Sequence, residues 1–424
     1  MIVRFGVSNF LSIRDKQELS LVASSLRDHE TGLIVNSSMS GRFLPVAVIY
    51  GANASGKSNV VRALGYMRGA VLYSHSRGDP SGGVRREPFA LDEEYAKKSS
   101  IFDIDFVVNS TRFHYGFEAS DDAFVAEWLW AFPAGKRQVL FQREGQKFEF
   151  GRSLKGQVNV IKELTRPNSL FISTAAQNNH EEAKNILSFF RSMDVMESTI
   201  AVESTTAVST LENNKEIDRI INFIRHLDNG IVGYRRSEIE VPEDAQKIQQ
   251  EVATFLSKFL KDDQLREATS ATAISIELAH RGCTGQSIYF NMARESAGTR
   301  RLLVLLDAAF RALNRGSPLI IDELDVSLHT QACEAIIAMF SLPELNPKGS
   351  QLIATTHNTN LLNPKLLRRD EIWFTEKDPE GATQVYPLTD IRTRHGDNLE
   401  KGYLQGRYGA VPYLGDAADF VSGQ

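Results

Sequence analysis

Residues 51–58 read GANASGKS, and this stretch decides the fold that the sequence predicts. It matches the pattern GxxxxGKS between an apolar segment at 44–50 and a helix-like segment at 58–67. In this pattern the glycines let the backbone curl until successive amide groups point at phosphate oxygens, and the following helix contributes its positive N-terminal end. The sequence therefore predicts a strand, a phosphate-binding loop and a helix in succession.

The polar positions of this loop have distinct expected tasks. Lys57 is placed to neutralise the β and γ phosphates of a nucleotide, and the Ser58 hydroxyl is placed to ligate Mg²⁺. No guanine-reading NKxD motif occurs in a plausible place, because NNKEID at 213–218 breaks the spacing, so ATP is expected rather than GTP. The residues expected to contact the nucleotide are Gly51, Ala54, Ser55, Gly56, Lys57 and Ser58.

The second half of such a site is an acid at the end of a buried strand. Residues 317–324 read SPLIIDEL, in which Asp322 and Glu323 follow three large aliphatic residues. An acid that follows a strand is usually a surface or capping residue. Because the chain also has a phosphate loop, we interpret these acids as part of the nucleotide site instead. We expect Asp322 to join the Mg²⁺ shell and Glu323 to polarise the attacking water as general base. The long separation from Lys57 predicts a large insertion between the two halves.

Composition excludes several classes of protein. The chain has 424 residues, of which 42% are hydrophobic and 24% charged, as in soluble globular proteins. The net charge of −5 argues against a surface built to coat nucleic acid, although a local basic groove stays open. No apolar run is long enough for a membrane span, so no membrane partner is expected. Cys283 and Cys333 are too few for a disulfide framework or a four-ligand zinc site, which favours the cytoplasm.

The spacing of apolar residues predicts an α/β fold with a central mixed or parallel sheet, an antiparallel β meander and a helical insertion. Short alternating runs predict the meander at 101–108, 113–118 and 139–150. Helical stripes at 217–227 and 247–262 are typical of core, with a partner surface as the alternative. The predicted segments are an N-terminal lobe at 1–178, the insertion at 179–270 and a C-terminal lobe at 271–424.

With both halves of the site in view, the chain resembles the ABC-type ATPases of the SMC, RecF and OLD kind. The loop GANASGKSN, with Asn53 and Asn59, resembles theirs, which adds these two residues to the expected nucleotide contacts. RESAGTRRLL at 294–303 resembles their signature motif through Ser296, Ala297 and Gly298. Glu295 replaces the usual leucine, and the alternative interpretation is a helix N-terminus capped by Ser296. The resemblance implies that one subunit's signature completes the ATP site of another.

Further motifs follow in the order that this group has. DELDVSLH at 322–329 resembles the acid strand with its D-loop at a dimer seam, which carries Asp325, Ser327 and His329. IATTHN at 353–358 places His357 like the switch histidine that senses the γ-phosphate. The resemblance also implies a Q-loop glutamine at the metal, for which Gln177 is the candidate.

Segments near the two ends of the chain indicate a more specific group within these ATPases. MIVRFGVSNFLSIRDKQELSLVA at 1–23, PFALD at 88–92 and GYLQGRYGAVPYL at 402–414 resemble the ATPase subunits of bacterial phage-defence operons, the RloA and AbiL-like group with the PARIS-type ATPases. That resemblance implies homodimers or higher oligomers that ATP brings together, and a trigger derived from the phage. It also implies a separately encoded toxic effector, for which a nuclease is the expected kind of protein. The stretch after His357 is too short for a nuclease domain, so the effector is expected on another chain.

The alternative is a RecF-like ATPase of DNA repair or chromosome maintenance. Basic clusters at 85–86, 235–236 and 365–369 would then line a DNA groove, and otherwise they are a solvated surface. An SMC-like rod is disfavoured, because no sustained heptads occur.

Overall fold

The computed structural model describes residues 1–26, 28–30, 32–36, 39–197, 214–227, 230–240, 272–394 and 396–411. It divides into two compact units, described separately below: a larger one of Met1–Ser198 with Arg311–Gln424, and a smaller one of Thr199–Phe310. The smaller unit is therefore inserted in the sequence of the larger one. These bounds differ from the boundaries expected at 178 and 270, which stay a prediction.

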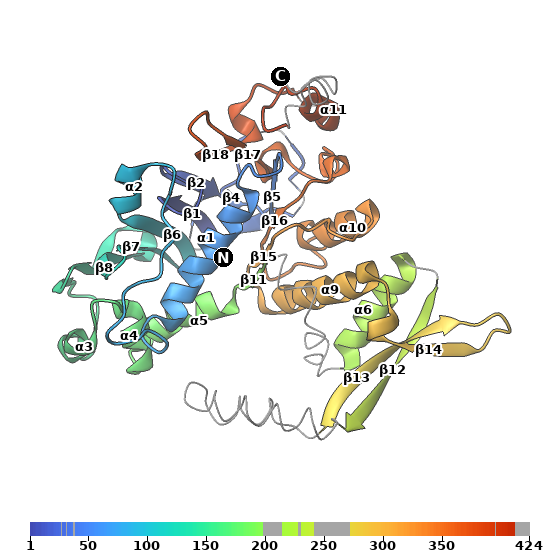
Figure 1. Ribbon diagram of the computed structural model, residues 1–424, viewed down its shortest axis with the longest axis horizontal. Coiled ribbons are helices and arrows are strands. Elements are labelled where there is room, and N and C mark those ends of the chain that lie inside the picture. Colours follow the sequence, from blue (N-terminus) through green and yellow to red (C-terminus); the bar gives the residue numbers. More distant parts are fainter. Residues whose placement is uncertain are drawn as a thin grey trace. The chain divides into compact units, whose positions relative to one another are not determined.

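A six-stranded sheet with one antiparallel edge strand forms the centre of the larger unit (Figure 1). Its order is β11-β15-β16-β5-β17-β18, and all neighbours are parallel except the pair β17 and β18. Parallel strands are usually covered on both faces, and β5, β15 and β16 are buried at every residue. The strands are β5 (Val46–Gly51), β11 (Asp194–Met196), β15 (Leu319–Ile321), β16 (Leu352–Thr355), β17 (Ile372–Lys377) and β18 (Thr383–Pro387).

A seven-stranded antiparallel sheet contains the predicted meander. Its order is β10-β9-β8-β7-β6-β1-β2, so consecutive strands pair from β6 to β10. Alternating residues such as Phe102, Ile104 and Phe106 are buried on its inner face. The strands are β1 (Ile2–Ser8), β2 (Gln17–Ser20), β6 (Ser100–Val108), β7 (Thr111–Ala119), β8 (Phe124–Phe132), β9 (Gln138–Glu144) and β10 (Lys147–Phe150); β3 (Ile34–Val35) and β4 (Arg42–Phe43) form a separate pair. The predicted α/β fold is thus confirmed.

Helix α1 and one glutamine join the two sheets of the larger unit. Tyr66 of α1 stacks on Phe102 of β6 with ring centroids 4.8 Å apart, and α1 also contacts β5 and β16. The buried Gln351 accepts from the Ile2 amide at 2.6 Å and donates to the Ile2 and Leu44 carbonyls. The helices of this unit are α1 (Lys57–Tyr73), α2 (Glu93–Lys97), α3 (Val158–Leu164), α4 (Phe171–Gln177), α5 (Glu181–Ser192), α10 (Thr330–Ser341) and α11 (Leu399–Leu404).

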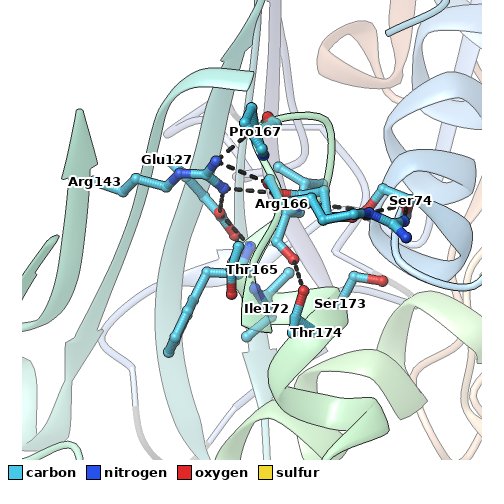
Figure 2. A network of polar contacts seen from close by, with 12 residues as sticks. Ser74, Glu127, Arg143, Thr165, Arg166, Pro167, Ile172, Ser173 and Thr174 are labelled. Carbon is cyan, nitrogen blue, oxygen red and sulfur yellow. Dashed lines mark hydrogen bonds and ion pairs between the residues drawn. The ribbon is translucent and has the colours of Figure 1, made fainter. Parts of the chain in front are cut away.

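A buried ion pair ties the seven-stranded sheet to the helices (Figure 2). Glu127 of β8 accepts from the first two amides of α4, and Arg143 of β9 lies 3.6 Å from it. Arg143 donates to carbonyls of the loop 166–169, from which Arg166 reaches the Ser74 carbonyl after α1. Burial raises the pKa of Glu127 and lowers that of Arg143, so each depends on the other to stay charged. The end of the phosphate-loop helix is thereby fixed to the sheet.

The smaller unit contains helix α6 and a three-stranded antiparallel sheet of order β12-β13-β14. The isoleucines of the stripe at 217–227 are buried in α6, which confirms its interpretation as core. The strand β12 was not expected from the sequence, and the stripe at 247–262 lies outside the described residues. The elements are α6 (Asn214–Leu227), β12 (Ile231–Glu240), β13 (Thr272–Arg281), β14 (Ser287–Asn291), the short helix η3 (Met292–Arg294) and the start of α9 (Ala297–Arg315).

Within the described residues, no helix combines the length and the hydropathy needed to cross a bilayer.

Candidate functional site

The loop between β5 and α1 adopts a backbone that requires glycine at two positions. A Cβ added to Gly51 would lie 2.5 Å from both Ser55 Oγ and the Thr375 carbonyl oxygen. Gly56 has a φ of 106°, in the left-handed region, and a Cβ there would collide with the side chain of Thr383. The two glycines of GANASGKS thus permit the tight turn that precedes α1.

Lys57 is the first residue of α1 and is nearly buried, at 5% exposure. Its Nζ donates to the Gly51 carbonyl at 2.8 Å and to the Ala52 carbonyl at 2.9 Å. Burial lowers the pKa of this ammonium from 10.5 to about 8, although the nearby carboxylates, Asp322 first among them, oppose the shift. Desolvated in this way, the ammonium is suited to bind an anion that brings compensating charge.

Ser58 and Asp322 meet at the end of the parallel sheet. Ser58 Oγ donates to Asp322 Oδ1 at 3.1 Å, and Thr355 Oγ1 donates to the same oxygen at 2.6 Å. Asp322 directly follows the buried strand β15, as expected from SPLIIDEL, and its side chain is itself buried, at 3% exposure. A hydroxyl and a carboxylate from the two predicted halves of the site therefore lie within hydrogen-bond distance.

Glu323 is half-buried and has a φ of +55°, which few non-glycine residues adopt. Its amide donates to Thr355 Oγ1 at 2.7 Å. The turn that follows Asp322 is thus anchored to the neighbouring strand β16.

Asp325 connects the predicted D-loop to the predicted switch segment. Its Oδ1 accepts from Thr356 Oγ1 at 2.7 Å and from the His357 amide at 3.1 Å. Partial burial and the charge of Lys57 lower the pKa of His357, whereas the three carboxylates of 322–325 oppose this. Ser327 is exposed with a φ of 61°, and His329 caps α10 by accepting from the Gln331 amide.

A set of hydroxyl groups that sequence reasoning missed surrounds the phosphate loop. Ser12 Oγ accepts from Asn59 Nδ2 at 2.5 Å and lies 2.7 Å from Thr383 Oγ1. Thr383 Oγ1 donates to the Ser55 carbonyl, and Ser55 Oγ lies 2.7 Å from Thr375 Oγ1. These residues come from the β1–β2 turn and from the strands β17 and β18. Only their polarity could have indicated them.

Other predicted residues lie at the surface of the two units. Asn53 and Ala54 are exposed at the tip of the phosphate loop. Gln177 is exposed at the C-terminal end of α4, and in the described part of the chain none of the hydrogen bonds that join Ser58, Asp322 and Thr355 involves it. The assignment of Gln177 to the metal is untested.

The predicted signature segment belongs to the smaller unit. Ser296 Oγ accepts from the Thr299 amide at 3.0 Å and so caps α9, as the alternative interpretation expected. Ser296 and Ala297 are exposed, and Gly298 is half-buried. Glu295, which replaces the usual leucine, has its Oε1 2.9 Å from His280 Nε2. The cap is compatible with either interpretation.

The donor set fits Mg²⁺ better than a metal held by protein alone. Among the described residues there is no group of three or more His, Cys, Asp or Glu side chains that would hold a metal ion. Mg²⁺ needs fewer protein ligands, since it keeps waters and binds through one or two carboxylates and substrate phosphates. Ser58 and Asp322 supply hard oxygen ligands of this kind.

Comparison with protein families matches residues 46–363, from β5 to the segment after His357. The matching family is described as "AAA domain, putative AbiEii toxin, Type IV TA system". The chain belongs to this family. It is therefore a P-loop ATPase of the AAA type by family, and Gly51–Ser58 and Asp322 lie in the matched region. No curated protein matches the chain.

Proposed function

We propose that the chain is the ATP-hydrolysing sensor subunit of a bacterial anti-phage system, and that it controls a separate toxic effector through ATP-dependent association of its subunits. The observation that carries the proposal is the hydrogen-bonded chain from Ser58 through Asp322 to Thr355. It brings the phosphate loop, the acid and the switch strand into one site, in a family whose description refers to a toxin–antitoxin system.

The chemistry at this site is water attack on the γ-phosphorus of ATP. Lys57 exchanges its two carbonyl partners for phosphate oxygens, while Ser58 and Asp322 would hold Mg²⁺, which neutralises developing charge. Glu323 accepts a proton from the attacking water as the new phosphorus–oxygen bond forms. The bond to the bridging oxygen breaks and releases ADP and phosphate. His357 lies on the switch segment that would sense the γ-phosphate.

Association between copies of the chain links ATP hydrolysis to control of the effector. An exposed helix start at Ser296 and Ala297 offers amide donors and a positive helix end to the phosphate of a second copy. Nucleotide then binds the associated state better than the separate state, which is the difference that a switch requires. Asp325, Ser327 and His329 would lie at the seam between the copies, and release of phosphate would open it.

The alternative, a RecF-like DNA-binding ATPase, is less well supported by the basic clusters. Arg86 pairs with Asp121, Arg235 with Glu277, Arg368 with Asp370 and Arg369 with Asp28. Paired guanidinium groups have less to gain from a DNA phosphate, because each must first give up its carboxylate. A DNA site on these four arginines is thus disfavoured.

The deciding experiment is purification of the tagged chain from its native cells in Mg-ATP, followed by native mass spectrometry. A second protein in stoichiometric amount, together with ATP turnover in vitro, is the expected result. Copies of this chain alone with bound DNA, and DNA affinity that falls steeply with salt, would replace the proposal with the repair ATPase. Toxicity from this chain expressed without any partner would identify it as the effector instead.

A further inference from the structure

Thr355, the last residue of β16, makes hydrogen bonds to three consecutive residues of the acid loop. Its hydroxyl donates to Asp322 Oδ1 at 2.6 Å and accepts from the Glu323 amide at 2.7 Å. Its carbonyl accepts from the Leu324 amide at 2.9 Å. The residue is completely buried. Valine would fill the same space without either bond of the hydroxyl.

The bond to the Glu323 amide acts on a strained residue. Because Glu323 has a φ of +55°, its backbone lies in a region that side-chain-bearing residues rarely adopt. Such conformations persist where surrounding contacts over-determine them, and they gather at functional sites. The Thr355 hydroxyl is one of these contacts, since it fixes the peptide unit that begins the turn.

The bond to Asp322 acts on a carboxylate with two hydroxyl donors. Ser58 Oγ and Thr355 Oγ1 both donate to Oδ1. Ser58 is the residue expected to turn toward a metal-bound nucleotide, whereas Thr355 lies on the sheet beneath the site. Thr355 can therefore hold the carboxylate in one orientation whether or not the Ser58 bond is made.

We propose that Thr355 is a positioning residue for hydrolysis, which sets the places of the Glu323 backbone and the Asp322 carboxylate. Its hydroxyl acts through these two residues, so it governs kcat and leaves nucleotide affinity nearly unchanged. This part of the inference rests on the proposed ATPase activity. The hydrogen bond itself is open to a measurement that needs no activity.

The test compares Thr355→Val with Thr355→Ser, which keeps the hydroxyl and removes the methyl group. Thr165→Val is the matched control, because Thr165 is also buried and its hydroxyl donates to the Ile161 carbonyl, outside the site. For each protein, kcat and KM for ATP are measured in Mg²⁺, with the Kd of a non-hydrolysable ATP analogue. Amide hydrogen exchange of a peptide covering 319–326 is measured without nucleotide.

In Thr355→Val we expect kcat to fall about 10- to 100-fold, as for catalytic groups that are misplaced by about 1 Å. The Kd of the analogue should change less than about threefold. In the 319–326 peptide, one amide, that of Glu323, should exchange at least tenfold faster. Serine should restore both readouts and Thr165→Val should alter neither. Thr355→Ala takes the place of valine should that variant be insoluble.

Two results would overturn the proposal. One is a Thr355→Val variant with unchanged kcat and unchanged exchange. The other is a Thr355→Ser variant with kcat and exchange as altered as in Thr355→Val, which would assign the effect to the loss of the methyl group. A wild-type chain without ATP turnover would instead remove the proposed activity. The exchange measurement would then still decide whether Thr355 holds the turn.

Discussion

Ser58 Oγ lies 3.1 Å from Asp322 Oδ1, although 264 residues separate the two in sequence. The contact forms because β5 and β15 flank β16 in the same parallel sheet, so that the carboxyl ends of all three strands meet at one edge. Phosphate loop, acid and switch histidine are thereby brought to a single place.

Lys57→Ala should abolish nucleotide binding, with a Kd for ATP at least about 100-fold higher, which corresponds to about 2.7 kcal/mol. Lys57 is the first residue of α1, and its ammonium donates to the Gly51 and Ala52 carbonyls in the phosphate loop. Fluorescence titration with a labelled ATP analogue measures the loss, and circular dichroism checks the fold. ATP affinity equal to that of the wild type would refute the phosphate-loop assignment.

ATP affinity should also depend on pH through Lys57. Its pKa is about 8 in the nucleotide-free protein, so between pH 8 and 10.5 the folded chain holds fewer protons than the unfolded chain. ATP prefers the charged form, and raising the pH through 8 therefore weakens binding, about tenfold between pH 7.5 and 9. The terminal phosphate of ATP does not contribute, since its second pKa is about 6.

The control for this pH dependence is Lys57→Met, which should bind weakly with no slope over the same range. Isothermal titration calorimetry in two buffers of different ionisation enthalpy would also detect proton uptake on binding. A wild-type affinity that stays constant from pH 7.5 to 9 would contradict the shifted pKa.

Much of this site follows from sequence, because its chemistry sits in local motifs. GANASGKS directly follows an apolar strand segment, and SPLIIDEL contains a buried strand with two acids directly after it. Both patterns can be recognised in the sequence alone. Thr375, Thr383 and Ser12 carry no such pattern, and IATTHN indicated His357 but not the bonds that Thr355 makes. Their roles arise from strand order in the sheets, which non-local pairing decides and no short stretch encodes. The strand β12 was missed for the same reason, since it is stabilised by pairing with β13.

Glu323→Gln should bind ATP normally and hydrolyse it at least about 100-fold more slowly. The amide keeps the size of the side chain but cannot accept a proton from water. Phosphate release under steady-state conditions measures the rate, and analogue binding measures the affinity. Turnover at the normal rate would remove Glu323 from the role of general base, whereas lost binding would indicate a structural role for the carboxylate.

Arg143→Met should destabilise the larger unit by about 3–5 kcal/mol, because it leaves the buried Glu127 carboxylate without its cation. Urea unfolding monitored by tryptophan fluorescence measures the change. The double variant Glu127→Gln/Arg143→Met removes both charges, and its destabilisation should be smaller than the sum of the two single effects. Additive effects would show that the pair does not interact.

Ser296→Arg should prevent association of the subunits while the isolated chain still binds ATP. The side chain is exposed at the start of α9, where the bulk of arginine would obstruct the surface expected to meet a second copy's nucleotide. Loss of the cap costs only about 1 kcal/mol, so the fold should survive.

Association is measured by mass photometry with ATP in a Glu323→Gln background, which holds the nucleotide unhydrolysed. Ser287→Arg is the control, because Ser287 is equally exposed, on β14 of the same unit. Dimers that persist in Ser296→Arg would mean that the signature segment does not complete a site in another copy.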